Sequence, residues 1–194
     1  MKLPAGLLLL LAAADSYTIA VIPKGTTHEF WKSISAGAVK AQREFAEKGI
    51  KVDLIWKGPL REDDRDLQIQ LVESFISKRV SGIVLASFDS KVLVAPVNTA
   101  TRTKIPVIVI DSALQSDKPI SYVATDNFKG GQIGAGHLGQ LLGGKGSVIL
   151  LRYAVGSAST EGCETGFLNV MKKNYPGIKI IQRSLRRSSW PWRR

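Results

Sequence analysis

Short apolar runs recur along the chain, and most are followed by a longer segment in which apolar residues return every three or four positions. The short runs are rich in valine and isoleucine and do not alternate with polar residues. That composition is typical of strands buried on both faces of a parallel sheet. The runs predict strands at Tyr17–Ile22, Val52–Trp56, Gly82–Ala86, Val107–Ile110, Tyr122–Thr125, Ser147–Leu151 and Ile178–Ile181.

The longer segments have the period of helices that cover such a sheet. Residues 65–78 carry a broad apolar face, and Pro96 fits a helix only in or near its first turn. The predicted helices are Phe30–Glu47, Arg65–Lys78, Val92–Thr103, Phe128–Leu142 and Thr160–Asn174. Strands that alternate with helices indicate right-handed crossovers, so the expected fold class is α/β with a doubly wound parallel sheet.

One connection breaks this rhythm. The segment "DSALQSDKPIS" after Ile110 has no helical period, and an irregular passage of this kind is where one lobe can lead into another. We therefore predict an N-terminal α/β lobe at residues 15–125. A second α/β lobe at residues 126–183 is expected to be incomplete, with about two strands and two helices.

The two ends of the chain differ from the rest. Residues 1–14 contain Lys2, the apolar run "GLLLLLAAA" and small residues before Asp15, which predicts a signal peptide; a buried N-terminal helix is the alternative. Residues 184–194, "SLRRSSWPWRR", have no periodicity. They are interpreted as an atypical basic tail, disordered or lying on a membrane surface, or as the product of a truncation or frameshift.

The net charge of +11 comes from 27 basic and 16 acidic residues, and it argues less for nucleic-acid binding than its size suggests. Five arginines lie within the last twelve residues, whereas a nucleic-acid footprint is expected to cluster on the folded body. Cys163 is the only cysteine, so no disulfide can form within the chain and no cysteine metal cluster can exist.

Two glycine-rich motifs imitate nucleotide sites in the wrong context. "GAGHLG" at 134–139 fits the dinucleotide fingerprint and "GQLLGGKG" at 139–146 approaches a phosphate-binding loop, but both belong to a helical pattern that precedes a strand. Close helix packing is the better interpretation of these glycines. His28 and His137 have no metal-ligand spacing, and Glu62, Asp63 and Asp64 are interpreted as a solvated loop and a helix cap. We therefore expect no enzymatic activity, metal or cofactor.

Polar and aromatic residues follow several predicted strands at their carboxyl ends, where open α/β sheets bind ligands. Aromatic faces can stack on the C–H faces of a sugar, and a carboxylate can accept hydrogen bonds from its hydroxyl groups. The candidate ligand-binding residues are His28, Phe30, Trp31, Asp111 and Thr125. Phe30 as a core residue, Asp111 as a turn residue and Thr125 as a strand terminus remain open alternatives.

Five blocks carry a resemblance to a known family: "IAVIPKGTTHEFWKSISAGAVKAQREF", "DLQIQLVESFISKRVSGIVLASFDS", "IPVIVIDSAL", "YVATDNFKGGQIGAGHL" and "VGSASTEGCETGF". The chain resembles periplasmic sugar-binding proteins of the ribose-binding type, which are related to the effector domains of lactose-repressor-like transcription factors. The resemblance implies two lobes that close on a sugar, a periplasmic or cell-envelope location, and an ABC transporter permease as partner. We expect a monomer.

The resemblance also assigns roles. It implies that Phe30 and Trp31 grip the sugar ring, that Asp111 binds hydroxyl groups, and that His28 and Thr125 are polar contacts. Ser112 stands where ribose binders usually have arginine, and Glu161 and Cys163 occupy the region of a second expected arginine, so ribose itself is in doubt. A sensor domain of the same fold and a non-functional truncated fragment are the alternatives to a transport protein.

Overall fold

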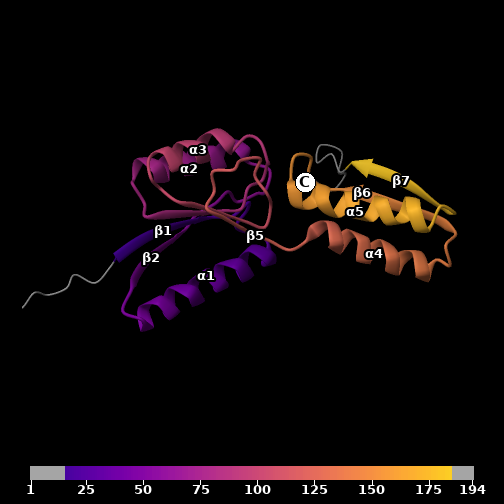
Figure 1. The fold of residues 1–194 in the computed structure, drawn as a ribbon, viewed down its shortest axis with the longest axis horizontal. Coiled ribbons are helices and arrows are strands. Elements are labelled where there is room, and N and C mark those ends of the chain that lie inside the picture. The colour runs from indigo at the N-terminus through magenta and orange to yellow at the C-terminus, as the bar shows by residue number, and fades with distance from the viewer. Residues whose placement is uncertain (1–15, 185–194) are drawn as a thin grey trace, which may run out of the picture.

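The computed structural model describes residues 16–184, in which five parallel strands form the first sheet. The strands are β1 (Ser16–Ile22), β2 (Lys51–Trp56), β3 (Gly82–Leu85), β4 (Val107–Ile110) and β5 (Ser121–Val123), in the spatial order β2-β1-β3-β4-β5. β1 lies in the sheet with β2 on one side and β3 on the other, so the chain reverses its direction of travel across the sheet there (Figure 1). The predicted signal peptide at 1–14 lies outside the described residues, as does all but the first residue of the predicted tail at 184–194.

Helices cover both faces of this sheet (Figure 1). Helices α2 (Arg65–Ser77) and α3 (Val94–Arg102) lie on one face, and α1 (Glu29–Glu47) lies on the other. Pro96 is the third residue of α3, where its missing N–H would have no partner within the helix. Side chains of α2 and α3 pack against β1, β3 and β4 to form the main core: Ala20, Ile22, Leu71, Val72, Phe75, Ile83, Leu85, Leu93, Val97, Ala100, Val107 and Val109.

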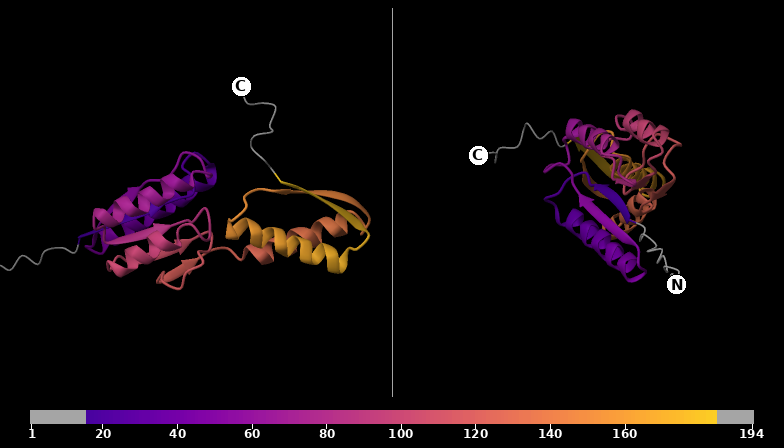
Figure 2. Two further views of the ribbon diagram at one scale, coloured as in Figure 1. Left: turned by 90° about the horizontal axis from the view of Figure 1, so that it is seen from above. Right: turned by 90° about the vertical axis from the view of Figure 1, so that its left-hand side faces the viewer.

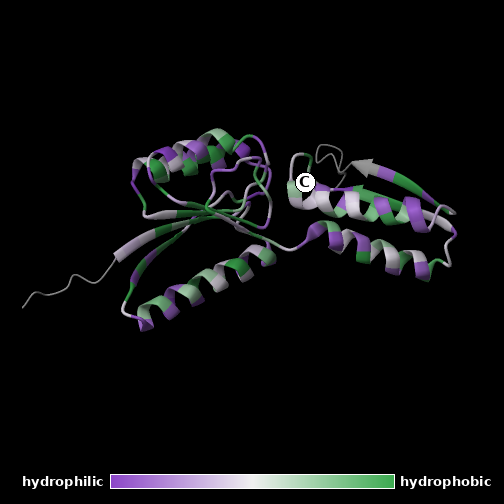
Figure 3. Cartoon of the chain, viewed as in Figure 1, coloured by the Kyte–Doolittle hydropathy of each residue, from purple (hydrophilic) through white to green (hydrophobic). Residues whose placement is uncertain are grey.

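The α1 face of the sheet is packed less deeply. Trp31 is the one residue of α1 that is fully buried, and Phe45 near the other end of the helix is exposed. Figure 3 shows apolar and polar residues alternating around the helices, as expected where only one face of each helix is packed. The expected apolar stripe of α1 therefore contributes less to the core than the broad apolar face of α2.

The second group of elements comprises α4 (Asn127–Leu141), β6 (Gly146–Arg152), α5 (Ala158–Asn174) and β7 (Ile178–Ser184). β6 and β7 pair in parallel, and both helices pack on the same face of this small sheet (Figure 2). On the other face of β6, Ile149 and Leu151 are exposed. Residues 124–126 connect β5 to α4, and the boundary predicted at residues 125 and 126 falls in this connection.

Glycines let α4 and α5 approach each other closely. A Cβ at Gly131 would stand 2.0 Å from the carbonyl oxygen of Cys163, and one at Gly166 would stand 2.0 Å from that of Phe128. Gly139, within "GAGHLG", faces the ring of Tyr175, while Gly134 and Gly136 have nothing within 4 Å. The motif lies inside α4, so the helix-packing interpretation is confirmed at Gly139, and a dinucleotide loop is absent from this segment.

The α/β class, the parallel sheet and the order of all the expected helices and strands are confirmed. The connection from β4 to β5 contains no helix, also as expected. Element ends shift by a few residues; β5 ends at Val123, so Thr125 follows the strand instead of closing it. Among residues 16–184, no helix is both long enough and apolar enough to cross a membrane.

Candidate functional site

The site lies at the carboxyl ends of β1, β3 and β4. A parallel sheet in the order 2-1-3-4-5 has its switch point between β1 and β3, where chain crossovers leave in opposite directions and a crevice opens. The loops after β1 and β4 bring Lys24 and Asp111 to this crevice, and the loop after β3 brings Phe88.

A cavity of about 370 Å³ occupies this position, within the size range of small-molecule sites. Both groups of elements contribute to its wall. Its lining residues are Lys24, His28, Phe30, Trp31, Glu62, Phe88, Asp111, Tyr153, Ala154, Ser157, Ser159 and Thr160. The cavity therefore lies between the lobes and not within either one.

The adjacent aromatic residues Phe30 and Trp31 differ in burial. The side chain of Trp31 is buried, with 2% of its surface exposed, whereas Phe30 is 45% exposed. The two rings meet edge to face, with centroids 4.9 Å apart and planes at 80°. The indole N–H of Trp31 donates to Glu62 Oε1 at 2.7 Å. An aromatic corner results, with one ring fixed in the wall and the other open toward solvent.

His28 immediately precedes α1, and one of its ring nitrogens is hydrogen-bonded to the backbone. Its Nδ1 accepts a hydrogen bond from the backbone N–H of Phe30 at 3.2 Å, so the side chain acts as the N-cap of α1. In the neutral ring the proton then resides on Nε2, which remains available as a donor.

Lys24 lies at the centre of the polar wall, only 5% exposed. Its ammonium is 2.7 Å from Asp111 Oδ2 and donates to the hydroxyl groups of Ser157 at 3.3 Å and Ser159 at 3.1 Å. Asp111 has a left-handed backbone conformation, with φ of 62°, which is uncommon for a residue with a side chain. Its buried Oδ2 has no hydrogen bond of good geometry within residues 16–184, so the contact with Lys24 is an ion pair.

The segment between β6 and α5 docks on the first lobe. The Tyr153 hydroxyl donates to Glu62 Oε2 at 3.2 Å, the backbone N–H of Ser90 donates to the carbonyl of Gly156 at 2.9 Å, and Arg65 donates to the carbonyl of Val155 at 3.1 Å. These hydrogen bonds join the two lobes, and the one between Tyr153 and Glu62 does so at the cavity itself. The structure is thus a closed arrangement.

Ser112 and Glu161, at positions where the resemblance leads us to expect arginines in ribose binders, accept hydrogen bonds from the backbone at or just before the start of α5. The backbone N–H of Ser159 donates to Ser112 Oγ at 3.1 Å, and the backbone N–H of Gly156 donates to Glu161 Oε1 at 2.8 Å. Cys163 lies beyond the cavity and donates weakly to Asn127 Oδ1 at 3.6 Å. Burial, with a smaller effect of the neighbouring Glu164 charge, raises the pKa of the Cys163 thiol.

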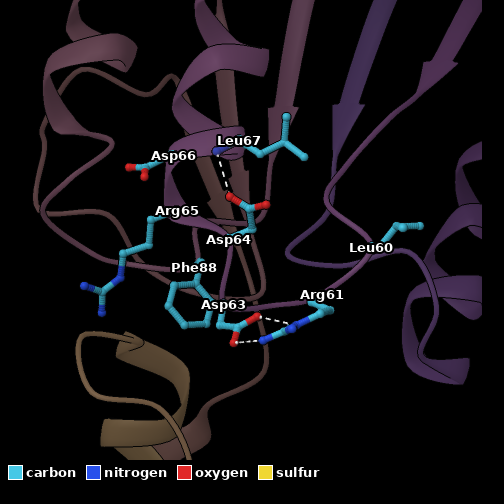
Figure 4. A pocket seen from close by; sticks show the side chains of 8 residues that line it. All are labelled: Leu60, Arg61, Asp63, Asp64, Arg65, Asp66, Leu67 and Phe88. Atoms are coloured by element: carbon cyan, nitrogen blue, oxygen red, sulfur yellow. Dashed lines mark hydrogen bonds and ion pairs between the residues drawn. The ribbon is translucent and has the colours of Figure 1, made fainter. Parts of the chain in front are cut away.

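A larger and more open hollow of about 740 Å³ adjoins the cavity, and Phe88 lines both (Figure 4). It lies at the start of α2, where Asp64 caps the helix by accepting from the backbone N–H of Leu67 at 3.0 Å. The Arg61–Asp63 ion pair and the Arg65 guanidinium, which lies over the Phe88 ring, form its walls. Its side chains are mostly paired with one another, so we assign no ligand to it.

Four of the five sequence-predicted residues line the inter-lobe cavity: His28, Phe30, Trp31 and Asp111. Thr125 does not line it; the residue is exposed, and its carbonyl accepts from the side chain of Asn127. Sequence reasoning missed Lys24, although Lys24 lies only two residues after the end of β1, at the same edge of the sheet as Asp111 after β4. Glu62 does lie in the predicted loop, but the expectation that it is solvated was wrong, because it is half-buried and accepts from the indole of Trp31. Asp64 as a helix cap is confirmed.

Comparison with known proteins identifies the family. The model of the periplasmic binding protein domain matches residues 19–190. The chain belongs to the periplasmic binding protein domain family. Among curated members, the D-ribose/D-allose-binding protein of Pseudomonas aeruginosa is 30% identical over 178 residues, which cover 89% of this chain and 54% of that protein.

Other members of this domain family agree in both sequence and structure. The D-allose-binding periplasmic protein of Escherichia coli is 30% identical over 87% of this chain and 55% of its own length. A carbohydrate transporter solute-binding protein from Agrobacterium radiobacter, solved in complex with D-arabinose, aligns with a TM-score of 0.79 and 32% identity, covering 89% of this chain and 58% of that one. The chain spans about half the length of the curated relatives that it matches.

Proposed function

We propose that the protein is the substrate-binding component of an ABC-type sugar importer, and that it holds a monosaccharide or a similar small polar solute between its lobes. The supporting observation is that one cavity is lined by aromatic, cationic and anionic side chains of the first lobe and by tyrosine and serine hydroxyl groups of the second. Relatives named for sugar binding and import support the same proposal.

The residues have complementary roles in this proposal. Phe30 and Trp31 would contact the C–H faces of the sugar ring, whose C–H groups are apolar. Asp111 would accept hydrogen bonds from hydroxyl groups, while Lys24 and His28 would donate to ring or hydroxyl oxygens. No bond is made or broken, and selectivity follows from the cost of leaving these desolvated groups unpaired.

Closure supplies the signal to the transporter. A ligand that contacts both lobes favours the closed arrangement by its extra affinity for that state, and closure changes the surface offered to a permease. Residues 1–14 would direct export to the periplasm or cell envelope. Cell fractionation with N-terminal sequencing tests this point: a processed envelope protein that begins near Asp15 supports export, and an unprocessed cytoplasmic chain refutes it.

Isothermal titration with D-ribose, D-allose, D-arabinose and D-apiose tests the site. We expect the wild-type protein to bind at least one of them, and Trp31→Ala and Asp111→Ala each to weaken that binding at least tenfold, because each removes an interaction worth about 1.5 kcal/mol or more. Phe45→Ala, which removes an exposed ring from the same helix as Trp31, is the control. Equal affinities of all four proteins would refute the assigned site.

A further inference from the structure

Glu62 contacts the aromatic corner and the second lobe at the same time. Its Oε1 accepts from the indole N–H of Trp31 at 2.7 Å, and its Oε2 accepts from the Tyr153 hydroxyl at 3.2 Å. All three residues line the cavity. One carboxylate thus connects the fixed ring of the first lobe to a residue that comes from the loop after β6.

The position of Glu62 is set by two loops that are joined along their length. Thr26 and Thr27, in the loop after β1, donate through their hydroxyl groups to the carbonyls of Pro59 at 3.1 Å and Leu60 at 3.0 Å. Gly25 packs so closely that a Cβ there would stand 2.9 Å from Glu62 Cγ. The absence of a side chain at Gly25 therefore leaves the space that Glu62 Cγ needs beside this loop.

No cation forms an ion pair with Glu62 within residues 16–184. The carboxylate instead directs its two oxygens at two neutral donors, one from each lobe. Hydrogen bonds to a charged acceptor are stronger than those between neutral groups, and each fixes the direction of its donor. A solvated loop carboxylate would not need this arrangement.

We propose that Glu62 is a positioning residue, which holds the indole of Trp31 in the orientation that receives the sugar and couples that orientation to lobe closure through Tyr153. This inference rests on the proposed function and adds a specific residue to it. When the lobes separate, the Tyr153 hydroxyl leaves Glu62, and the carboxylate keeps only its bond to the indole. Closure therefore adds a second hydrogen bond that holds Glu62, and through Glu62 the Trp31 indole, in position.

Three substitutions separate the effect of the hydrogen bond between Trp31 and Glu62, the indole link, from that of the hydrogen bond between Tyr153 and Glu62, the link across the lobes. Glu62→Ala removes both, Tyr153→Phe removes only the link across the lobes, and Glu62→Gln keeps an oxygen that can accept from the indole. Asp66→Ala is the control, because it removes an exposed carboxylate near the start of α2. Circular dichroism establishes that each variant is folded, and Glu62→Gln keeps the test valid if Glu62→Ala does not fold.

The indole link is read by NMR of the ligand-free protein, whose four tryptophans give four indole N–H signals. Trp31→Phe identifies the relevant signal. We expect that signal to be protected from hydrogen exchange in the wild type, in Glu62→Gln and in Asp66→Ala, and to lose its protection in Glu62→Ala. An unchanged signal and unchanged protection in Glu62→Ala would overturn the positioning role.

The link across the lobes is read by small-angle X-ray scattering without ligand and by titration with the sugar that binds best. We expect both Tyr153→Phe and Glu62→Ala to increase the radius of gyration. Tyr153→Phe should weaken binding about tenfold, and Glu62→Ala at least as much, because it also removes the hydrogen bond from the indole. The double variant should bind no more weakly than Glu62→Ala alone, because both substitutions remove the same contact across the lobes. Additive losses in the double variant would contradict coupling through this contact.

The proposed function and the proposed role of Glu62 would be refuted by different results. If the wild type binds none of the sugars but Glu62→Ala still loses indole protection and expands, the proposed function is refuted and the structural link stands. If the wild type binds a sugar while Glu62→Ala and Tyr153→Phe bind it equally well and stay compact, the inference about Glu62 is refuted and the proposed function stands.

Discussion

At the scale of single residues, the cavity depends on a charge that is almost fully buried. The Lys24 ammonium is compensated by Asp111 of its own lobe and by the hydroxyl groups of Ser157 and Ser159 from the other. A buried ion pair adds little net stability compared with apolar packing, but removal of one partner leaves the other charge desolvated. The Lys24–Asp111 ion pair is therefore better understood as fixing the positions of the charged groups that line the cavity than as a source of stability.

Substitution of Lys24 by methionine tests this interpretation. We expect Lys24→Met to lower the free energy of unfolding by about 1–3 kcal/mol, because Asp111 loses its cation while it remains partly buried. Lys24→Met combined with Asp111→Asn should recover part of the loss, since no uncompensated charge remains. Urea denaturation measures both values. A double variant that is less stable than Lys24→Met would show that the charges are not coupled.

The thiol of Cys163 provides a pH-dependent prediction. Its pKa is raised, mainly by burial and secondly by the Glu164 charge, so at any pH below that raised value less thiolate is present than in an exposed cysteine. Iodoacetamide should therefore react slowly near pH 8, and the midpoint of the rate profile should lie above the usual value of about 8.5. The same reaction in urea supplies the reference profile. A folded-state midpoint at or below that reference would contradict the prediction.

At the scale of elements, the strands and helices could be predicted because each has a strong periodic signal and the turns between them are polar. The parallel direction of strands joined by helices follows from the βαβ repetition. Two features could not be predicted. Which of the adjacent Phe30 and Trp31 is buried depends on the acceptor at Glu62, and the choice of Thr125 assumed that β5 extends two residues beyond its end at Val123.

The contact between α4 and α5 depends on glycines at particular positions. Gly131→Ala places a Cβ against the backbone of α5, and we expect the helices to move apart at a cost of about 1–3 kcal/mol in the free energy of unfolding. Gly130→Ala is a matched control in the same helix, since nothing lies within 4 Å of its Cβ position. That control should be neutral or slightly stabilising because alanine favours helix. Chemical denaturation distinguishes the pair, and equal stabilities would refute the close-packing argument.

At the scale of the whole molecule, two lobes joined by residues 124–126 meet through the segment that precedes α5 and the start of α5 itself. The contacts of that segment with Glu62, Arg65 and Ser90 do not involve a ligand, so part of the closing free energy belongs to the protein itself. A ligand then needs to supply only the remainder, and its apparent affinity depends on the closed fraction that exists without it. Substitutions far from the sugar can thus tune affinity.

Gly156 offers the sharpest test of this idea. Its φ is +91°, and a Cβ there would stand 2.5 Å from Asp89 Oδ2. The Asp89 carboxylate cannot easily move aside, because its other oxygen accepts from the backbone N–H groups of Lys91 and Val92. We therefore expect Gly156→Ala to keep the lobes apart and to weaken sugar binding about tenfold or more, as the loss of the closed state predicts.

Hydrogen exchange at the backbone N–H of Ser90 reports this separation directly, because that group donates to the carbonyl of Gly156 in the closed arrangement. Its protection should disappear in Gly156→Ala, while amides in β3 keep theirs. Gly146→Ala controls for backbone strain, since Gly146 also has a positive φ, +112°, and its Cβ position has no neighbour within 4 Å. If both variants lose Ser90 protection equally, strain in the second lobe is the cause. Loss confined to Gly156→Ala attributes closure to direct contact between the lobes, because the two changes differ in what the added methyl group meets.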